Sequence, residues 1–176
     1  ILKSALKSKP ELRFDNLEKL DLSYNRIDKR MIAEINNFLF SRMPKITSLN
    51  LYDNQIRDAG ATAIANSPHI ASLTHLNLRW NHIGVAGATA IANSPHMKKL
   101  ARLNLGGNQI GDEGACAVAN SPHMAHLTSL DLCNNQIGDE GATAIANSPH
   151  MARLNSLNLS FNQIGDVGAT AIAESE

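Results

Sequence analysis

Residues 73–83 read LTHLNLRWNHI, and the spacing L-x-x-L-x-L-x-x-N-x-I within this stretch returns along most of the chain. Apolar and polar residues alternate in each copy, which predicts a short strand with leucines on one side and polar residues on the other. Successive copies start 29, 27, 27, 27 and 27 residues apart. The six copies begin at Leu17, Ile46, Leu73, Leu100, Leu127 and Leu154.

The second half of each unit is also repeated. GATAIANSPHM occupies residues 87–97 and again 141–151, with near copies at 60–70 and 114–124. Ala61, Ile64 and Ala65 have the i, i+3, i+4 spacing of a narrow apolar helix face, and the following proline should end the helix. An aspartate precedes this stretch at 58, 112, 139 and 166, where we expect it to cap its own helix. Val85 replaces it in the third unit, so we expect that helix to start less firmly.

These two patterns resemble the leucine-rich repeat family, whose period is 20–29 residues. The helical stretch, as in residues 137–146, is similar to the ribonuclease-inhibitor-like subfamily, and the resemblance covers residues 17–176. It implies an α/β fold: a right-handed solenoid, or horseshoe, with parallel strands on the concave face and helices on the convex face. It also implies a structural hydrogen-bonding ladder for the asparagines Asn25, Asn54, Asn81, Asn108, Asn135 and Asn162.

The unit boundaries predict one domain in two parts. Residues 1–45 form an atypical amino-terminal unit or cap that includes the first repeat, and 46–176 form five regular units, the last of them truncated. Residues 1–45 hold ten Lys/Arg and six Asp/Glu, a balance of +4 that the rest of the chain offsets to a formal net charge of zero. A general affinity for nucleic acid or for membranes is therefore not expected.

Other function classes find little support in the residues. Two cysteines do not make a disulfide framework, which favours an intracellular, reducing compartment, and no apolar run approaches a membrane span. Cys133 should face the concave side, but its lateral neighbours Gly106 and Ser160 cannot activate a thiol, and His126 is a weak alternative base. The column His69, His96, His123 and His150 lacks the converging geometry of most metal sites. We expect no enzyme activity, cofactor or metal.

Variation between units indicates where specificity lies. Positions three, five, seven and eight of each unit should point outward from the concave face. Four of the seven aromatic residues fall in columns seven and eight, and Trp, Tyr and Arg are typical of interface hot spots. Gly106 and Gly107 should leave open space beside Trp80 for a partner side chain. The predicted partner-binding residues are Tyr24, Tyr52, Asp53, His75, Arg79, Trp80, Arg102 and Phe161.

The sequence therefore predicts a monomeric protein–protein interaction module with its site on the concave face. The near-identical 27-residue units are similar to those of bacterial leucine-rich-repeat effectors, which implies an effector that acts on a host protein in the host cytosol. Two alternatives stay open. The chain could be a sensor or autoinhibitory repeat domain of a larger receptor-like protein, or a structural or consensus-engineered scaffold.

Overall fold

The computed structural model describes residues 13–175 and contains a six-stranded parallel sheet whose strands follow in chain order. Each strand pairs with the next in the same register, so equivalent positions of neighbouring units lie side by side, as with Leu49, Leu76 and Leu103. The strands are β1 (Lys19–Asp21), β2 (Ser48–Asn50), β3 (His75–Asn77), β4 (Arg102–Asn104), β5 (Ser129–Asp131) and β6 (Ser156–Asn158).

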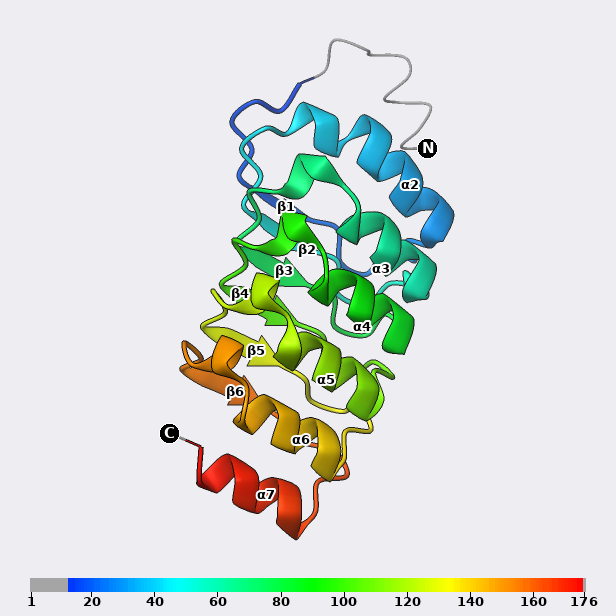
Figure 1. The fold of residues 1–176 in the computed structure, drawn as a ribbon. Helices are drawn as coiled ribbons and strands as arrows, with labels where there is room; N and C mark the ends of the chain where they lie inside the picture. The colour runs from blue at the N-terminus through cyan, green and yellow to red at the C-terminus, as the bar shows by residue number, and fades with distance from the viewer. Residues whose placement is uncertain (1–12, 176) are drawn as a thin grey trace.

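One helix follows each strand, and the helices form a second layer along the opposite side of the molecule (Figure 1). The predicted solenoid, with strands on one face and helices on the other, is confirmed. The helices are α2 (Lys29–Phe38), α3 (Arg57–Ala65), α4 (Val85–Ala92), α5 (Gly111–Asn120), α6 (Asp139–Ala146) and α7 (Asp166–Ala173). None of the helices within residues 13–175 combines the length and apolar character that crossing a bilayer requires.

The core lies between the two layers. The leucines of strands β2 to β5 are buried there, and the predicted helix face of Ala61, Ile64 and Ala65 packs against them. The leucines of the two end strands are less covered, with Leu157 of β6 38% exposed. Small alanines allow each helix to lie close to the sheet, while the larger isoleucine fills the space between units. A single unit could not bury both surfaces, so each unit depends on its neighbours for its core.

The repeated asparagines form the expected ladder beside this core. Asn108 Oδ1 accepts hydrogen bonds from the backbone N–H groups of Asn81 (3.0 Å) and Ile83 (2.9 Å) in the preceding unit. Its Nδ2 donates to the carbonyl oxygens of Leu78 (3.0 Å) and Leu105 (2.8 Å). Because these backbone groups are buried where the strand turns away, the side chain supplies partners that water cannot.

The aspartates cap a different helix from the one expected. Asp58 lies in the first turn of α3, but its Oδ1 accepts from the N–H groups of Gly84 (2.7 Å) and Gly87 (3.0 Å), at the start of α4. Asp112 and Asp139 make the equivalent bonds to the starts of α6 and α7. The expectation that each carboxylate caps its own unit's helix was wrong, because the short inter-unit distance brings it over the next one.

Because each aspartate caps the helix of the next unit, its replacement by Val85 affects the start of α5 and not the start of α4. Helix α4 is capped by Asp58, and its Gly84 has an extended φ of −100°. Helix α5, which follows the Val85 unit, starts differently: Gly111 has a φ of 57°, and its amide donates to the carbonyl oxygen of Asn135 at 3.0 Å. Arg57, which follows a unit with Lys29 at that position, behaves in the same way with a φ of 55°.

Helices α3 to α6 end near the Asn-Ser-Pro sequence as predicted, but the proline then begins a 3-10 turn before the next strand. These turns are η2 (Pro68–Ile70), η3 (Pro95–Met97), η4 (Pro122–Met124) and η5 (Pro149–Met151). The preceding serine forms a second ladder: Ser121 Oγ donates to the carbonyl oxygen of Ala92 at 2.6 Å, and Ser94 bonds Ala65 in the same way. This ladder satisfies carbonyl groups at the ends of the helices.

The first unit differs from the others. Helix α2 is capped by its own aspartate, because Asp28 accepts from the N–H groups of Arg30 (3.0 Å) and Met31 (2.9 Å), and it leads into η1 (Phe40–Arg42). The backbone N–H of Phe14 donates to the carbonyl oxygen of Arg42 at 3.0 Å, which holds the segment before β1 against this unit. Residues 1–12, part of the predicted cap, lie outside the described residues.

Candidate functional site

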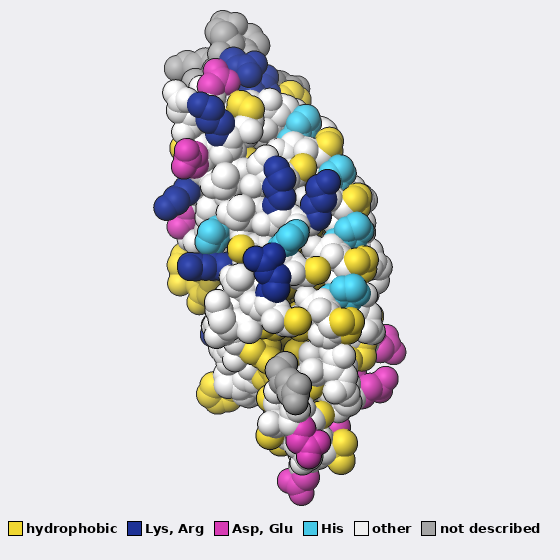
Figure 2. Space-filling model, turned by 60° about the vertical axis from the view of Figure 1, so that its left-hand side comes forward, with side chains coloured by type: hydrophobic (Ala, Val, Ile, Leu, Met, Phe, Trp, Pro, Cys, Tyr) yellow, Lys and Arg dark blue, Asp and Glu magenta, His cyan; other side chains and the backbone are white. Residues whose placement is uncertain are grey.

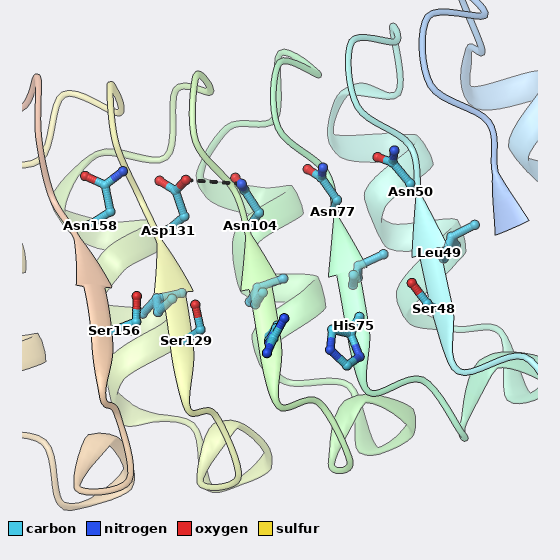
Figure 3. Close-up of a pocket in the computed structure, with 14 residues that line it drawn as sticks. Ser48, Leu49, Asn50, His75, Asn77, Asn104, Ser129, Asp131, Ser156 and Asn158 are labelled. Carbon is cyan, nitrogen blue, oxygen red and sulfur yellow. Dashed lines mark hydrogen bonds between the residues drawn. The ribbon is translucent and has the colours of Figure 1, made fainter. Parts of the chain in front are cut away.

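The concave face of the sheet forms an open groove of about 490 Å³. Side chains at positions three and five of units two to six line it, and Figure 3 shows the two rows in front of the strands. The row at position five is a nearly uniform run of amides, joined at one point by a hydrogen bond from Asn104 Nδ2 to Asp131 Oδ2 of 3.1 Å. The row at position three varies, with His75 and Arg102 between serines.

His75 and Arg102 form the basic part of this groove. They are register partners on β3 and β4, so their side chains lie next to each other on the concave side. Partial burial, and then the positive charges of Arg102 and Lys19, lower the pKa of the His75 imidazole. The two predicted residues are therefore brought together, and the groove carries positive potential where a partner's anionic group could lie.

Arg79 is directed away from this pair. Its guanidinium forms an ion pair with Asp131, two units further on, with a Nη1–Oδ2 distance of 3.5 Å. Gly106 lies in the unit between them and has no side chain to block the crossing. A surface pair of this kind contributes only about 0–1 kcal/mol, but it directs the Arg79 guanidinium toward Asp131 on β5 rather than toward His75 and Arg102.

The two glycines beside Trp80 do not leave the predicted open space. A Cβ added to Gly107 would lie 2.5 Å from Cδ2 of Trp80, so the indole ring already rests on this glycine. A Cβ on Gly106 would lie 2.8 Å from the Sγ of Cys133, which fills the other position. The expectation of a vacant space for a partner side chain was wrong: both glycines accommodate neighbouring side chains of this chain.

The rim of the groove, where each strand turns toward its helix, has an unusual backbone. All six residues at position eight have φ between 51° and 64°, the left-handed region. Asp, Asn and Gly tolerate this region well, and they occupy three of the six positions. Aromatic residues occupy the other three, and they are exposed: Tyr24 by 69%, Trp80 by 42% and Phe161 by 86%.

Four rim side chains enclose a hollow of about 250 Å³: Tyr52, Asp53, Trp80 and His82. Tyr24 extends this cluster, because its ring meets that of Tyr52 edge-on with centroids 5.0 Å apart and an interplanar angle of 74°. The sequence predicted all of these residues except His82. The sequence does distinguish His82 from its counterparts, because four of the six units have glutamine at the equivalent position. Phe161 lies three units away from Trp80 and does not join the cluster.

The described residues offer little chemistry for catalysis. Burial, and then Asp131, raise the pKa of the Cys133 thiol, which opposes formation of a nucleophilic thiolate. His126, the alternative base, precedes β5 whereas Cys133 follows it, and its Nδ1 lies 3.0 Å from Nη1 of Arg153. Within residues 13–175, no three His, Cys, Asp or Glu side chains form a group that could hold a metal ion.

Charge is separated across the surface. Figure 2 shows Lys, Arg and His side chains gathered over the middle of one face, with a row of histidines along one side and most Asp and Glu at the margins. Lys98, Lys99 and Arg153 lie in segments that connect a 3-10 turn to the next strand. The aspartates that cap helices lie at the other ends of the strands.

Comparisons with known proteins agree with this architecture. A Leucine Rich repeat family model matches residues 42–65, 69–92, 96–119, 123–146 and 150–173, and a second Leucine Rich Repeat model matches residues 16–38. No curated protein matches the chain. Among solved structures, an internalin (inlF) from Listeria monocytogenes is similar, with a TM-score of 0.59 and 26% sequence identity over 92% of this chain. The match spans 47% of the internalin chain. From its repeats and its fold, this chain belongs to the leucine-rich repeat family.

Proposed function

We propose that the concave groove and its aromatic rim bind a partner protein. Leucine-rich repeat proteins generally bind protein partners, and this fold indicates an interaction module. The observation that carries the proposed site is the placement of exposed Tyr24, Trp80 and Phe161 at left-handed rim positions.

The energetics of the rim support a binding role. A left-handed conformation disfavours an L-residue with a Cβ by roughly 1–2 kcal/mol, and Gly, Asn or Asp relieve part of this. The same column uses Asp53, Gly107 and Asn134 in other units, so the fold accepts these types there. The rings of Tyr24 and Phe161 stay largely exposed, so burial offsets little of this strain, and the strain at Trp80 is offset only in part. Their presence is better accounted for by contacts with a partner, in which Trp and Tyr contribute most of the binding energy.

The test is capture of partners from cell lysate with the original chain and with a triple rim variant, Tyr52→Ala, Arg79→Glu and Trp80→Ala. We expect at least one protein to be retained by the original chain and lost by the variant. A triple variant on exposed convex positions, Glu113→Gln, Glu140→Gln and Val167→Ala, should retain it. Identical captures by all three chains would contradict a site on this face.

The finer proposal is that the chain is part of a bacterial effector that acts on a host protein in the reducing host cytosol. Its support is the run of near-identical 27-residue units, the free Cys116 and Cys133, and the similarity to a Listeria internalin. The sequence of the full-length gene and an assay of delivery into host cells test this proposal. A carboxyl-terminal secretion signal and delivery of the tagged protein into host cells are expected, whereas an adjoining nucleotide-binding domain would instead favour the sensor alternative.

Two further parts of the proposal concern organisation. We propose that residues 1–45 act as the amino-terminal cap of a monomer and that the regular units 46–176 are of the ribonuclease-inhibitor-like type, with one helix per strand. The Asp28 cap, which lies within the same unit as α2, supports the first point. Sedimentation equilibrium should give the monomer mass, and a dimer mass would contradict this part.

A further inference from the structure

The rim hollow of Tyr52, Asp53, Trp80 and His82 has the composition of a site for a cation, and we infer that it binds an arginine side chain of the partner. The inference rests on the proposed function and names the chemistry of one contact within it. The hollow, of about 250 Å³, is large enough for a guanidinium group and part of its aliphatic stem.

The charge of the hollow comes from Asp53. Its side chain is exposed at the rim and forms no ion pair with any residue in the 13–175 range. Arg79, which directly precedes Trp80 in the chain, is paired with Asp131 and so does not neutralise Asp53. An incoming cation would therefore meet a carboxylate that has no competing internal partner, whereas a carboxylate or phosphate from the partner would be repelled.

Two aromatic rings complete the recognition. Trp80 rests on Gly107, which fixes the plane of the indole, and it remains 42% exposed. Tyr52 is held by its edge contact with Tyr24. A guanidinium group stacks on such faces while it forms hydrogen bonds to a carboxylate, and its planar shape suits this combination better than the compact ammonium group of lysine.

Several features separate this site from the concave groove. His75 and Arg102 give the groove positive potential, which suits an anionic group. The hollow lies at the opposite ends of the strands and carries a carboxylate between aromatic rings. A partner with an arginine at the rim and an acidic residue in the groove would match both sites and would be held in one orientation.

Trp80 is the sole tryptophan of the chain, so its fluorescence and its indole N–H resonance report directly on the hollow. The probe is N-acetyl-arginine amide, titrated into the protein at constant ionic strength. A parallel titration uses N-acetyl-citrulline amide, which has the same shape without the charge. We expect a saturable change at millimolar concentrations for the arginine probe, and binding about tenfold weaker for the citrulline probe.

Asp53→Asn is the decisive variant, because asparagine suits the left-handed backbone and removes only the charge. We expect it to weaken binding of the arginine probe about five- to tenfold and to leave binding of the citrulline probe unchanged. Glu113→Gln removes a carboxylate from the exposed side of α5 and should change neither. Equal binding of both probes, no saturable response of Trp80, or full retention of arginine binding by Asp53→Asn would overturn the inference.

The result is distinguishable from failure of the proposed function. If capture of a partner depends on Trp80 but the arginine probe shows no preference, the interaction face stands and the cation site is refuted. If the arginine probe binds as expected but no partner depends on the rim, the hollow is a cation site and the proposed function fails.

Discussion

Trp80 is positioned by a residue that has no side chain. The indole ring occupies the volume that a Cβ on Gly107 would need, and Gly107 also has a φ of 64°, where glycine is favoured for its own sake. Gly111 has a similar φ of 57°, but a Cβ added there would meet no atom within 4 Å. A substitution at Gly111 therefore tests backbone strain alone, without a side-chain clash like the one with Trp80.

The pair Gly107→Ala and Gly111→Ala therefore makes a matched prediction. Both should lower the free energy of unfolding by about 1–2 kcal/mol through backbone strain. Only Gly107→Ala should also displace the indole ring, which would shift the Trp80 emission maximum. Urea unfolding followed by circular dichroism gives the stability, and the emission spectrum of the folded protein gives the ring position. An unchanged emission in Gly107→Ala would contradict the described contact.

Single residues also mark the limit of what the sequence predicts. The variable columns identified Tyr52, Asp53 and Trp80 because exposed aromatic and charged types stand out against a repeated background. The same reasoning did not show that Arg79 pairs with Asp131, because this aspartate lies two units away and the contact depends on the missing side chain of Gly106. It also read Gly107 as open space, since a pattern of residue types does not show which neighbouring ring lies over a glycine.

The helices show that capping operates between units. Three aspartates, Asp58, Asp112 and Asp139, each accept hydrogen bonds from two backbone amides. These amides belong to the Gly-x-x-Gly sequence at which the helix of the following unit begins. Glycine is needed there, because a Cβ on Gly141 would lie 2.8 Å from the Oδ1 of Asp112. The helices themselves were predictable from their apolar spacing. Their capping partner was not, since it depends on the distance between stacked units and not on local sequence.

Asp112→Ala and Asp166→Ala test this arrangement. Both aspartates lie in the first turn of their own helix, so any interaction with that helix's dipole is common to the two. Asp112→Ala also removes the cap of α6 and should lower the free energy of unfolding by about 1 kcal/mol more than Asp166→Ala. Asp166 accepts no backbone amide among residues 13–175. Equal losses, measured by thermal unfolding, would rule out the inter-unit cap.

At the scale of the whole molecule, stability depends on ladders that join all the units. The asparagine ladder, the serine ladder and the sheet each connect one unit to the next, so local damage should be transmitted to neighbouring units. The sequence predicted the asparagine ladder through its resemblance, and the strict repetition of the pattern made the solenoid predictable. The serine ladder and the 3-10 turns were not predicted. The serines do repeat every 27 residues in the Asn-Ser-Pro sequence, but this repetition does not show that each hydroxyl donates to the helix of the preceding unit.

Asn108→Ala should be one of the most destabilising single changes in the chain. It would leave the buried amides of Asn81 and Ile83 without a partner, which predicts a loss of about 3–5 kcal/mol in the free energy of unfolding. The carbonyl groups of Leu78, Leu105 and Gly106 would each lose one of two donors. Asn25→Ala is the control at the exposed first unit, where, among residues 13–175, the side chain donates only to the carbonyl oxygen of Ser23, and the loss should stay within about 1 kcal/mol. Denaturant unfolding measures both, and similar losses would contradict a buried ladder.

The inter-unit cap has a consequence for how such a chain can evolve. Residues 87–97 and 141–151 are identical, so an exchange between their coding segments would remove two whole units without disturbing the repeat. The hybrid unit would carry Val85 directly before the last unit, and Gly165 and Gly168 would lose the carboxylate of Asp139. Helix α7 would then have to begin as α5 does now. Recombination of this kind would preserve the repeat but change which unit precedes which, and the order of the units matters for stability because each aspartate caps the helix of the next unit.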